Sequence, residues 1–529
     1  MAAEKISSEE VQNDYDAVPY ISYPYFNTHP EHLYTIGNLF GMEAASPSSA
    51  RVLELGCASG GNIIPMAIKF PEADFVGVDY STVQIDEANK HKEKLGLKNV
   101  EFKGVSISDI DESFGKFDYI AVHGILSWVP KDIQDKIFEV CDKNLSDNGI
   151  AYISYNTLPG WGIVRSIREM MLYHTDKFTN PADKIREARM LLNFIKHGNG
   201  LNSETAYTKF IQSEIDTLST CSDSYLIHDH LEENNEPFYF HEFMSNAHKN
   251  NLQYLGDAAV ATMFIGNFPK ETAEVLKKVG NDIVKAEQYM DFIRNRRFRS
   301  TLLCKKDIKI NRTIKGEKLK DFYLSTGVKP VQDVSKLDFT ADQTIDFRGS
   351  KGNEFKVRDK YLLAALLCLC EKSCAVNAND LLQDVAIRLG SLVLDNQYEE
   401  KLLNSMLVLV FSGNIDLSSA KPSYVDKISE KPEVSELARY QATYTDWVTN
   451  EVANKVTVDL FGRALLQHLN GENSFDDIVA NMKKHVVSKE LNIKEDGKVV
   501  TDEKVIEEKL RELINISLQK MLSSALLIG

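Results

Sequence analysis

The sequence is short of positive charge and has no long apolar segment. Its 529 residues include 61 basic and 77 acidic side chains, which gives a net charge of −16. Proteins that bind nucleic acid need Lys and Arg to meet phosphates, so this balance argues against a nucleic-acid partner. An acidic surface would attract a basic partner, such as a lysine-rich protein surface, although composition alone favours the simpler interpretation that the acidity keeps the protein soluble. The longest apolar runs, such as 362–370, are too short to span a bilayer, and no membrane insertion is expected.

Cysteine is also scarce, and the seven cysteines are scattered through the chain. An odd, dispersed set is typical of reduced thiols, so a cytoplasmic location is expected. The polar N-terminus lacks a basic segment followed by an apolar one, and no signal peptide is expected. Histidines and acids crowd in HDHLEE (228–233), at an expected helix start, but no second ligand cluster is evident and no metal site is predicted.

What the sequence does have is a regular alternation of apolar strands and helices. Strands are expected over 51–55, 74–79, 99–105, 117–123 and 149–156, with helices over 60–70, 81–96 and 131–144. This alternation predicts an α/β fold, a doubly wound parallel sheet with helices on both faces. Two later extended stretches, 251–257 and 297–306, are expected to join the same sheet as its last strands.

A glycine-rich turn follows the first expected strand, in RVLELGCASGGN (51–62). Such a turn brings backbone N–H groups and a helix N-terminus to a polar or anionic ligand. The spacing of Gly56, Gly60 and Gly61 differs from the dinucleotide fingerprint, and no lysine follows as in a phosphate-binding loop. With Glu54 ahead of it, the turn resembles the E-x-G-x-G-x-G motif of class I S-adenosylmethionine-dependent methyltransferases, Ala58 replacing the middle glycine.

Polar residues close three of the later strands. Asp79 ends the second strand, where an acid can accept hydrogen bonds from both ribose hydroxyls, as it also does in NAD sites. The alternative is an N-cap role for the next helix, with Ser81 as the rival cap. His123 ends the fourth strand and Asn156 the fifth, at the edge where ligands bind in open α/β sheets. His123 is a candidate base, and a supporting hydrogen-bonding role is equally open.

Six stretches together resemble one group of bacterial class I methyltransferases that carry a methyltransferase regulatory region. They are YDAVPY, THPEHL, ARVLELGCASGGN, FVGVDYS with QI, HGILSWVP and SYNTLPGW. The regulatory region is matched by 237–258 and 287–304, and ARYQATYTDWVTN with LFGRALLQHLNG resembles the winged-helix end domain. Within the group the chain is most similar to the rickettsial protein lysine methyltransferases that modify outer membrane protein B.

The resemblance implies a Rossmann-like methyltransferase domain with a helical insertion, a mixed middle domain and a C-terminal winged-helix-like domain. The expected divisions are a cofactor-binding core with an N-terminal lid over 1–177, a helical insertion over 178–245, the last sheet strands over 246–305, a middle domain over 306–425 and the winged-helix-like domain over 426–529. Apolar positions in the insertion suggest a homodimer contact, although burial within one chain explains them equally. They are Ile185, Leu191, Leu192 and Ile195.

The resemblance also implies which residues hold S-adenosylmethionine. The turn would lie against the methionine end of the cofactor. Asp79 would bind the ribose, and Tyr80 would pack on the adenine. The usual acid after the third strand is missing, and Asp109 lies three residues beyond Ser106, which puts the adenine contact there in doubt. The full implied set is Tyr15, His29, Glu54, Gly56, Ala58, Gly60, Asn62, Asp79, Tyr80, Gln84, Ser106, Ile107, His123 and Gly124, and the leader aromatics with His29 would close the site.

A lysine substrate, which the resemblance implies, adds one chemical demand. Its amine is protonated at neutral pH, and only the neutral form attacks a methyl group. An aromatic pocket lowers the amine pKa by desolvation. The candidate catalytic residues are Tyr20, Tyr25, His123, Asn156 and Trp161. The alternatives are methylation of a small molecule or RNA, and an inactive scaffold. Acidity argues against RNA, and the intact Glu54, glycines and Asp79 argue against the scaffold.

Overall fold

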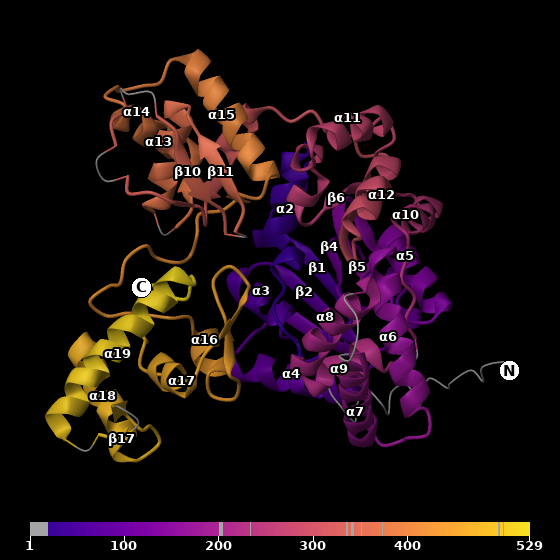
Figure 1. Ribbon diagram of the computed structural model, residues 1–529, viewed down its shortest axis with the longest axis horizontal. Helices are drawn as coiled ribbons and strands as arrows, with labels where there is room; N and C mark the ends of the chain where they lie inside the picture. The colour runs from indigo at the N-terminus through magenta and orange to yellow at the C-terminus, as the bar shows by residue number, and fades with distance from the viewer. Residues whose placement is uncertain are drawn as a thin grey trace. The chain divides into compact units, whose positions relative to one another are not determined.

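The computed structural model describes residues 20–199, 205–232, 234–334, 337–339, 343–350, 352–372, 374–495, 498–500 and 502–529 (Figure 1). The chain divides into two compact units. The first consists of residues up to Ser22 with 42–259 and 265–310, and the second of 23–41, 260–264 and 311–529. The finer division into five domains stays a prediction.

A seven-stranded sheet forms the centre of the first unit, in the order β3-β2-β1-β4-β5-β7-β6. Its strands are β1 (Arg51–Leu55), β2 (Asp74–Asp79), β3 (Val100–Gly104), β4 (Phe117–Val122), β5 (Leu145–Asn156), β6 (Leu252–Asp257) and β7 (Phe298–Lys305). Strands β1 to β5 pair in parallel, whereas β7 runs antiparallel between β5 and β6. The predicted doubly wound fold is confirmed, and the two late stretches are its β6 and β7.

Helices cover this sheet. Helices α3 (Ile63–Lys69), α4 (Thr82–Lys94), α5 (Lys131–Asn144) and α10 (Phe240–Lys249) pack against its strands. Helix α12 (Ile283–Arg294) bonds to β7 through Arg299, and α11 (Lys270–Val279) packs on α12. The central strands are buried on both faces, as in β4, where Tyr119, Ile120 and Val122 are almost fully buried, whereas the edge strand β3 alternates between buried and exposed residues. Strands covered on both faces need such continuous apolar runs. Because β1, β2, β4 and β5 run parallel, their carboxyl ends meet at one edge of the sheet.

Four helices follow β5: α6 (Gly160–Thr175), α7 (Pro181–Asn199), α8 (Ala206–Thr220) and α9 (Asp223–His230). They share an apolar core that contains Leu192, against which Ile185, Leu191 and Ile195 pack. Burial within the chain thus accounts for the apolar positions, and dimerisation through them stays a prediction. Because α9 ends at His230, the expectation of a helix start at HDHLEE was wrong.

The second unit begins with η1 (Phe26–Thr28) and α2 (Pro30–Leu39) and contains two separate apolar cores. The first core is built on α13 (Lys360–Cys370), α14 (Ala378–Arg388) and α15 (Asn396–Phe411), with small sheets of β8 (Tyr323–Ser325), β9 (Lys329–Pro330), β10 (Ile345–Arg348), β11 (Glu354–Val357), β12 (Val376–Asn377) and β13 (Asp416–Ser418). Leu39 of α2 belongs to this core.

The second core lies within the C-terminal hundred residues. Its helices are α16 (Glu436–Gln441), α17 (Leu460–Leu466), α18 (Phe475–Val487) and α19 (Glu503–Ser523), and its hairpins are β14 (Trp447–Thr449) with β15 (Lys455–Thr457) and β16 (Lys494–Glu495) with β17 (Lys498–Val499). Across the residues described in both units, no helix is long and apolar enough to cross a membrane.

Candidate active site

The glycine turn after β1 is a tight loop that only small residues can form. Gly56, Ala58 and Gly60 have φ of +74°, +46° and +81°. The backbone N–H groups of Gly56 and Cys57 donate to the carbonyl of Val78, over 2.8 and 3.0 Å. A Cβ on Gly56 would lie 2.3 Å from Ile125 Cδ1. A side chain at this position would have to displace the end of the Ile125 side chain, and the left-handed φ favours glycine as well.

Asp79 is bonded to this turn. Its Oδ2 accepts from the backbone N–H of Ala58 over 2.8 Å, and its Oδ1 from that of Ser81 over 2.9 Å. Ser81 itself is the N-cap of α4 and accepts from the N–H of Gln84. The cap alternative for Asp79 is therefore wrong. A carboxylate has about four acceptor positions, so these two backbone bonds leave room for a ligand's hydroxyl groups.

Glu54 is a buried residue near the end of β1, just before the turn. Its Oε1 accepts from Asn62 Nδ2 over 2.6 Å, while its buried Oε2 has no hydrogen-bond partner among the described residues. Burial raises the pKa of Glu54 to about 7, the Asn62 bond opposes this, and the charge of Asp79 adds to it. A buried carboxylate oxygen without a partner is costly, so the site has an acceptor in place for a cationic or N–H group.

The end of the leader lies on the turn. Ser22 Oγ accepts from the backbone N–H of Gly61 over 2.9 Å, and a Cβ on Gly61 would lie 2.2 Å from the carbonyl oxygen of Ser22. The carbonyl of Tyr20 accepts from Gln84 Nε2 over 3.1 Å. The Tyr20 ring stands edge-on to that of His228, with centroids 5.7 Å apart. The structure thus brings Tyr20 and Gln84 together.

The remaining leader residues are placed differently. Tyr15 lies outside the described residues. Tyr25 and His29 belong to the second unit, where the carbonyl of Tyr25 accepts from the N–H of Thr28 and His29 is the N-cap of α2. His29 Nδ1 accepts from the N–H of Glu31 over 3.3 Å. Their predicted places at the cofactor stay predictions.

His123 follows β4 and contacts β5. Its Nδ1 lies 2.9 Å from Tyr152 Oη and 3.3 Å from Ser154 Oγ. Burial lowers the pKa of His123 to about 4, so its imidazole is neutral at neutral pH. The next residue, Gly124, has φ +68° and open space where a Cβ would point, and its N–H donates to Ser154 Oγ over 2.9 Å.

Asn156, the last residue of β5, is buried and holds one unsatisfied group. Its backbone N–H donates to Ser127 Oγ over 2.9 Å, but its side-chain Nδ2 has no partner among the described residues. Trp161 at the start of α6 is 7% exposed, and its indole N–H donates to Asn235 Oδ1 over 2.7 Å. An indole fixed in this way is suited to packing rather than to proton transfer.

The adenine side of the predicted site is less complete. Tyr80 is 38% exposed beside Asp79. Ser106 caps η3 (Ile107–Asp109), and its backbone N–H donates to the Asp109 carboxylate over 3.3 Å. Asp109 is exposed and bonded to its own turn, so it does not replace the acid missing after β3.

Sequence reasoning missed Ser22, Tyr152 and Ser154. The two β5 residues are separated by two positions, the spacing of one face of a strand, but nothing local marks their contact with His123. The basic stretch 294–299 forms ion pairs. Arg296 pairs with Asp257 over 2.7 Å, and the fully buried Arg299 lies 2.8 Å from both Glu287 and Asp291.

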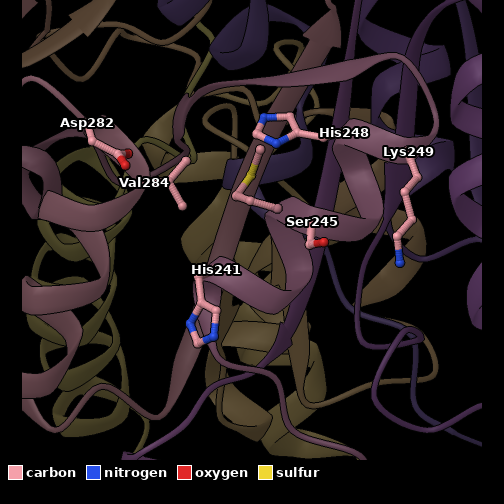
Figure 2. Close-up of a pocket in the computed structure, with 7 residues that line it drawn as sticks. His241, Ser245, His248, Lys249, Asp282 and Val284 are labelled. Atoms are coloured by element: carbon pink, nitrogen blue, oxygen red, sulfur yellow. The ribbon is translucent and has the colours of Figure 1, made fainter.

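A separate hollow of about 520 Å³ lies between α10 and the start of α12 (Figure 2). It is lined by His241, Met244, Ser245, His248, Lys249, Asp282 and Val284. Figure 2 shows that their polar groups point in different directions and do not converge. None of the predicted site residues lines it, so the cofactor turn is the candidate active site.

Three family models match consecutive parts of the chain. They are described as a methyltransferase domain (46–193), a predicted methyltransferase regulatory domain (222–305) and the C-terminal winged helix domain of PKMT (430–526). An uncharacterized protein of Rickettsia prowazekii is 45% identical over 522 residues, 98% of this chain and 94% of its own length. A ubiquinone biosynthesis O-methyltransferase of Actinobacillus pleuropneumoniae is 29% identical over 28% of this chain and 64% of its own length.

Among solved structures, PKMT2 from Rickettsia typhi in complex with AdoHcy is 38% identical, with a TM-score of 0.87, and the match covers 97% of this chain and all of the other. The sheet order, the glycine turn and these matches define a class I methyltransferase, for which S-adenosylmethionine is the methyl donor. More narrowly, the chain belongs to the rickettsial PKMT family, with its methyltransferase, regulatory and winged-helix domains.

Proposed function

We propose that this enzyme transfers methyl groups from S-adenosylmethionine to lysine side-chain amines of a substrate protein. We propose further that the substrate is an outer membrane protein B. The observation that carries the proposal is the nearly full-length likeness to the Rickettsia typhi PKMT2, which extends over the winged-helix domain as well as the catalytic sheet. The net charge of −16 also suits a lysine-rich substrate surface, because opposite charges steer the encounter.

The residues at the turn fit S-adenosylmethionine, which supplies an activated methyl group. In this proposal the unpartnered Oε2 of Glu54 accepts from the ammonium group of the methionine end. The small size of Ala58 and Gly60 lets that end approach the backbone closely, and Asp79 holds the ribose hydroxyls. Tyr80, partly exposed beside Asp79, covers the adenine.

The acceptor amine has to be oriented and kept away from water. Asn156 offers a buried amide N–H group without a partner at the end of β5, and we propose that it bonds to the substrate. Gly124 leaves open space beside His123. His123 itself is too weak a base to take a proton at neutral pH, because burial holds its pKa at about 4. In the proposal, the His123 imidazole holds the side chains of Tyr152 and Ser154 in position.

The test is incubation of the full-length protein with methyl-labelled S-adenosylmethionine and a purified lysine-rich fragment of outer membrane protein B. The expected result is label on lysine, located by mass spectrometry, with none on the same fragment after its lysines have been acetylated. Label on small molecules or RNA but not on the fragment would contradict the proposal. Absence of S-adenosylmethionine binding would instead indicate an inactive scaffold.

A further inference from the structure

A buried hydroxyl group of β7 reaches His123 through one intervening side chain. Ser300 Oγ lies 3.0 Å from Tyr152 Oη, and Tyr152 Oη lies 2.9 Å from His123 Nδ1. Ser300 is 7% exposed and Tyr152 is fully buried, so the bond between them is shielded from water. The three side chains form one hydrogen-bonded chain that runs from β7 across β5 to the end of β4.

The pairing of β5 with β7 creates this chain. The two strands run antiparallel, with Ser154 directly opposite Ser300 and Tyr152 two positions away. Tyr152 and Ser300 are therefore diagonal neighbours on one face of the sheet, within reach of a long side chain. Ser154 shares this face, and its Oγ accepts from the N–H of Gly124 over 2.9 Å and lies 3.3 Å from His123 Nδ1.

The count of donors decides where the His123 proton lies. Burial lowers the pKa of His123 to about 4, so at neutral pH the ring carries one proton, on Nδ1 or on Nε2. Tyr152 Oη is the only partner of Ser300 Oγ among the described residues. Because a buried hydroxyl hydrogen without an acceptor is costly, Ser300 donates to Tyr152, and Tyr152 in turn has a hydrogen for His123 Nδ1. Nδ1 is then an acceptor, and the proton lies on Nε2.

The position of this proton matters because His123 directly follows β4, at the edge where ligands bind in open parallel sheets. With the proton on Nε2, this nitrogen is a hydrogen-bond donor, and with the proton on Nδ1 it is an acceptor. In a neutral imidazole the hydrogen bond made by one nitrogen fixes the state of the other. Ser300 therefore determines which kind of group His123 has at Nε2.

Other residues at the start of β7 contact the same edge of the sheet. The strand lies within the part matched by the predicted methyltransferase regulatory domain, 222–305. The carbonyl of Arg297, just before β7, accepts from the N–H of Thr157, just after β5, over 2.8 Å. The Phe298 ring lies edge-on to that of His123, with centroids 6.2 Å apart. The regulatory region thus contacts the chain at the carboxyl ends of both β4 and β5.

We propose that Ser300 is a positioning residue for methyl transfer, and that it acts through Tyr152 by holding the proton of His123 on Nε2. The inference goes beyond the proposed function, because it concerns the cofactor edge of the enzyme whatever molecule receives the methyl group. It also gives the regulatory region a role, since the last strand of that region fixes a side chain beside the cofactor turn's own sheet edge.

The test detects the protonated nitrogen of His123 directly. Nitrogen-15 NMR of the full-length protein, labelled at histidine and saturated with AdoHcy at neutral pH, separates a ring nitrogen that carries hydrogen from one that does not. His123→Gln identifies the His123 signals. We expect the proton on Nε2 in the wild type. Ser300→Ala and Tyr152→Phe should each raise the fraction protonated on Nδ1 and lower kcat about fivefold, the effect of one hydrogen bond, with AdoHcy affinity unchanged within about twofold.

Thr301→Val and Tyr155→Phe are the matched controls. Tyr155 Oη and Thr301 Oγ1 also lie 3.0 Å apart and join the same two strands. Because successive side chains of a strand point to opposite faces, this pair lies on the other face of the sheet from the Ser300 chain. Each control removes a buried hydrogen bond between β5 and β7 without touching that chain, and should leave the His123 signals as they are in the wild type.

A proton on Nδ1 in the wild type would overturn the assignment, as would His123 signals that stay unchanged in Ser300→Ala and Tyr152→Phe. Shifted signals with an unchanged kcat, or an equal loss of kcat in the controls, would show that Ser300 does not position His123 for transfer. The NMR measurement needs no methyl acceptor, so the two proposals fail separately. The expected signals without transfer to the outer membrane protein B fragment would reject the proposed function alone, and transfer with unchanged signals would reject this inference alone.

Discussion

The backbone N–H of Ala58 donates a hydrogen bond to Oδ2 of Asp79, over 2.8 Å. This bond joins the glycine turn after β1 to the carboxylate at the end of β2. It depends on the left-handed φ of +46° at Ala58, a conformation that costs an alanine about 1–2 kcal/mol. The turn and Asp79 therefore support each other, and removing the Asp79 carboxylate should loosen the turn.

Asp79→Ala should abolish most of the affinity for S-adenosylmethionine. Losing two hydrogen bonds from ribose hydroxyls to a charged group costs about 2–4 kcal/mol, or roughly 30- to 1000-fold in affinity. Calorimetric titration of S-adenosylmethionine and NAD into wild type and variant tests this, and NAD should bind neither. Asp118→Ala is the control, because Asp118 bonds to the N–H of Arg51 at the start of β1. Equal affinities in wild type and Asp79→Ala would contradict the ribose role.

Glu54 should make the cofactor-free protein less stable as pH rises. Burial raises the pKa of Glu54 from 4.5 to about 7 in the folded state. Between pH 4.5 and pH 7 the unfolded chain therefore binds fewer protons than the folded protein. The stabilisation present below pH 4.5 is lost as pH rises through 7, by about 3 kcal/mol. Glu54→Gln keeps the acceptor for Asn62 and removes the titration.

Thermal unfolding of wild type and Glu54→Gln at pH 5.5 and 8 checks this expectation. The variant should gain stability over the wild type at the higher pH, and S-adenosylmethionine should narrow the gap by supplying an ammonium partner to the wild type. A difference that stays constant between the two pH values would show that Glu54 does not titrate in this range.

Gly61→Ala should detach the end of the leader. Its Cβ would lie 2.2 Å from the carbonyl oxygen of Ser22, a backbone atom that can yield only if the leader moves. Gly104→Ala is the matched control, since its Cβ would meet Thr82 Cγ2 at 3.6 Å, an ordinary contact. We expect faster chymotryptic cleavage after Tyr20 and weaker S-adenosylmethionine binding in Gly61→Ala only. Identical cleavage rates in the two variants would mean that Ser22 does not depend on this contact.

The sheet could be predicted because doubly buried strands leave continuous apolar runs in the sequence. Strands β1 and β2 have the predicted bounds, 51–55 and 74–79. The fifth strand begins at Leu145, four residues before the predicted start at 149. The prediction began late because the polar residues Ser146, Asp147 and Asn148 interrupt the apolar run. Strands β6 and β7 could be placed because each is a short apolar stretch after a long helical region.

The contacts that complete the site could not be predicted in the same way. Ser22 meets Gly61 across 39 positions, and His123 meets Ser154 across 31. Hydrogen bonds between such distant residues leave no local pattern, and they depend on how loops pack at the end of the sheet.

Arg299→Met should destabilise the first unit strongly. Arg299 is fully buried and bonds to Glu287 and to both oxygens of Asp291. Removing one partner of a buried ion pair leaves uncompensated charge and costs about 3–5 kcal/mol. Arg297→Met is the control, because Arg297 is 44% exposed where it pairs with Glu214 and should cost less than about 1 kcal/mol. Denaturant unfolding followed by far-UV circular dichroism compares the two, and similar losses would count against the buried network.

His123 should not set the pH dependence of methyl transfer. Burial lowers its pKa from 6.5 to about 4, so the imidazole stays neutral from pH 5.5 to 8 and takes no proton there. His123→Gln should lower the rate, because the contacts with Tyr152 and Ser154 change, but should leave the shape of the pH–rate profile as it is in the wild type. His197→Gln, on the exposed surface of α7, is the control for both quantities. Loss of a limb near pH 6.5 in His123→Gln alone would show that His123 is the base.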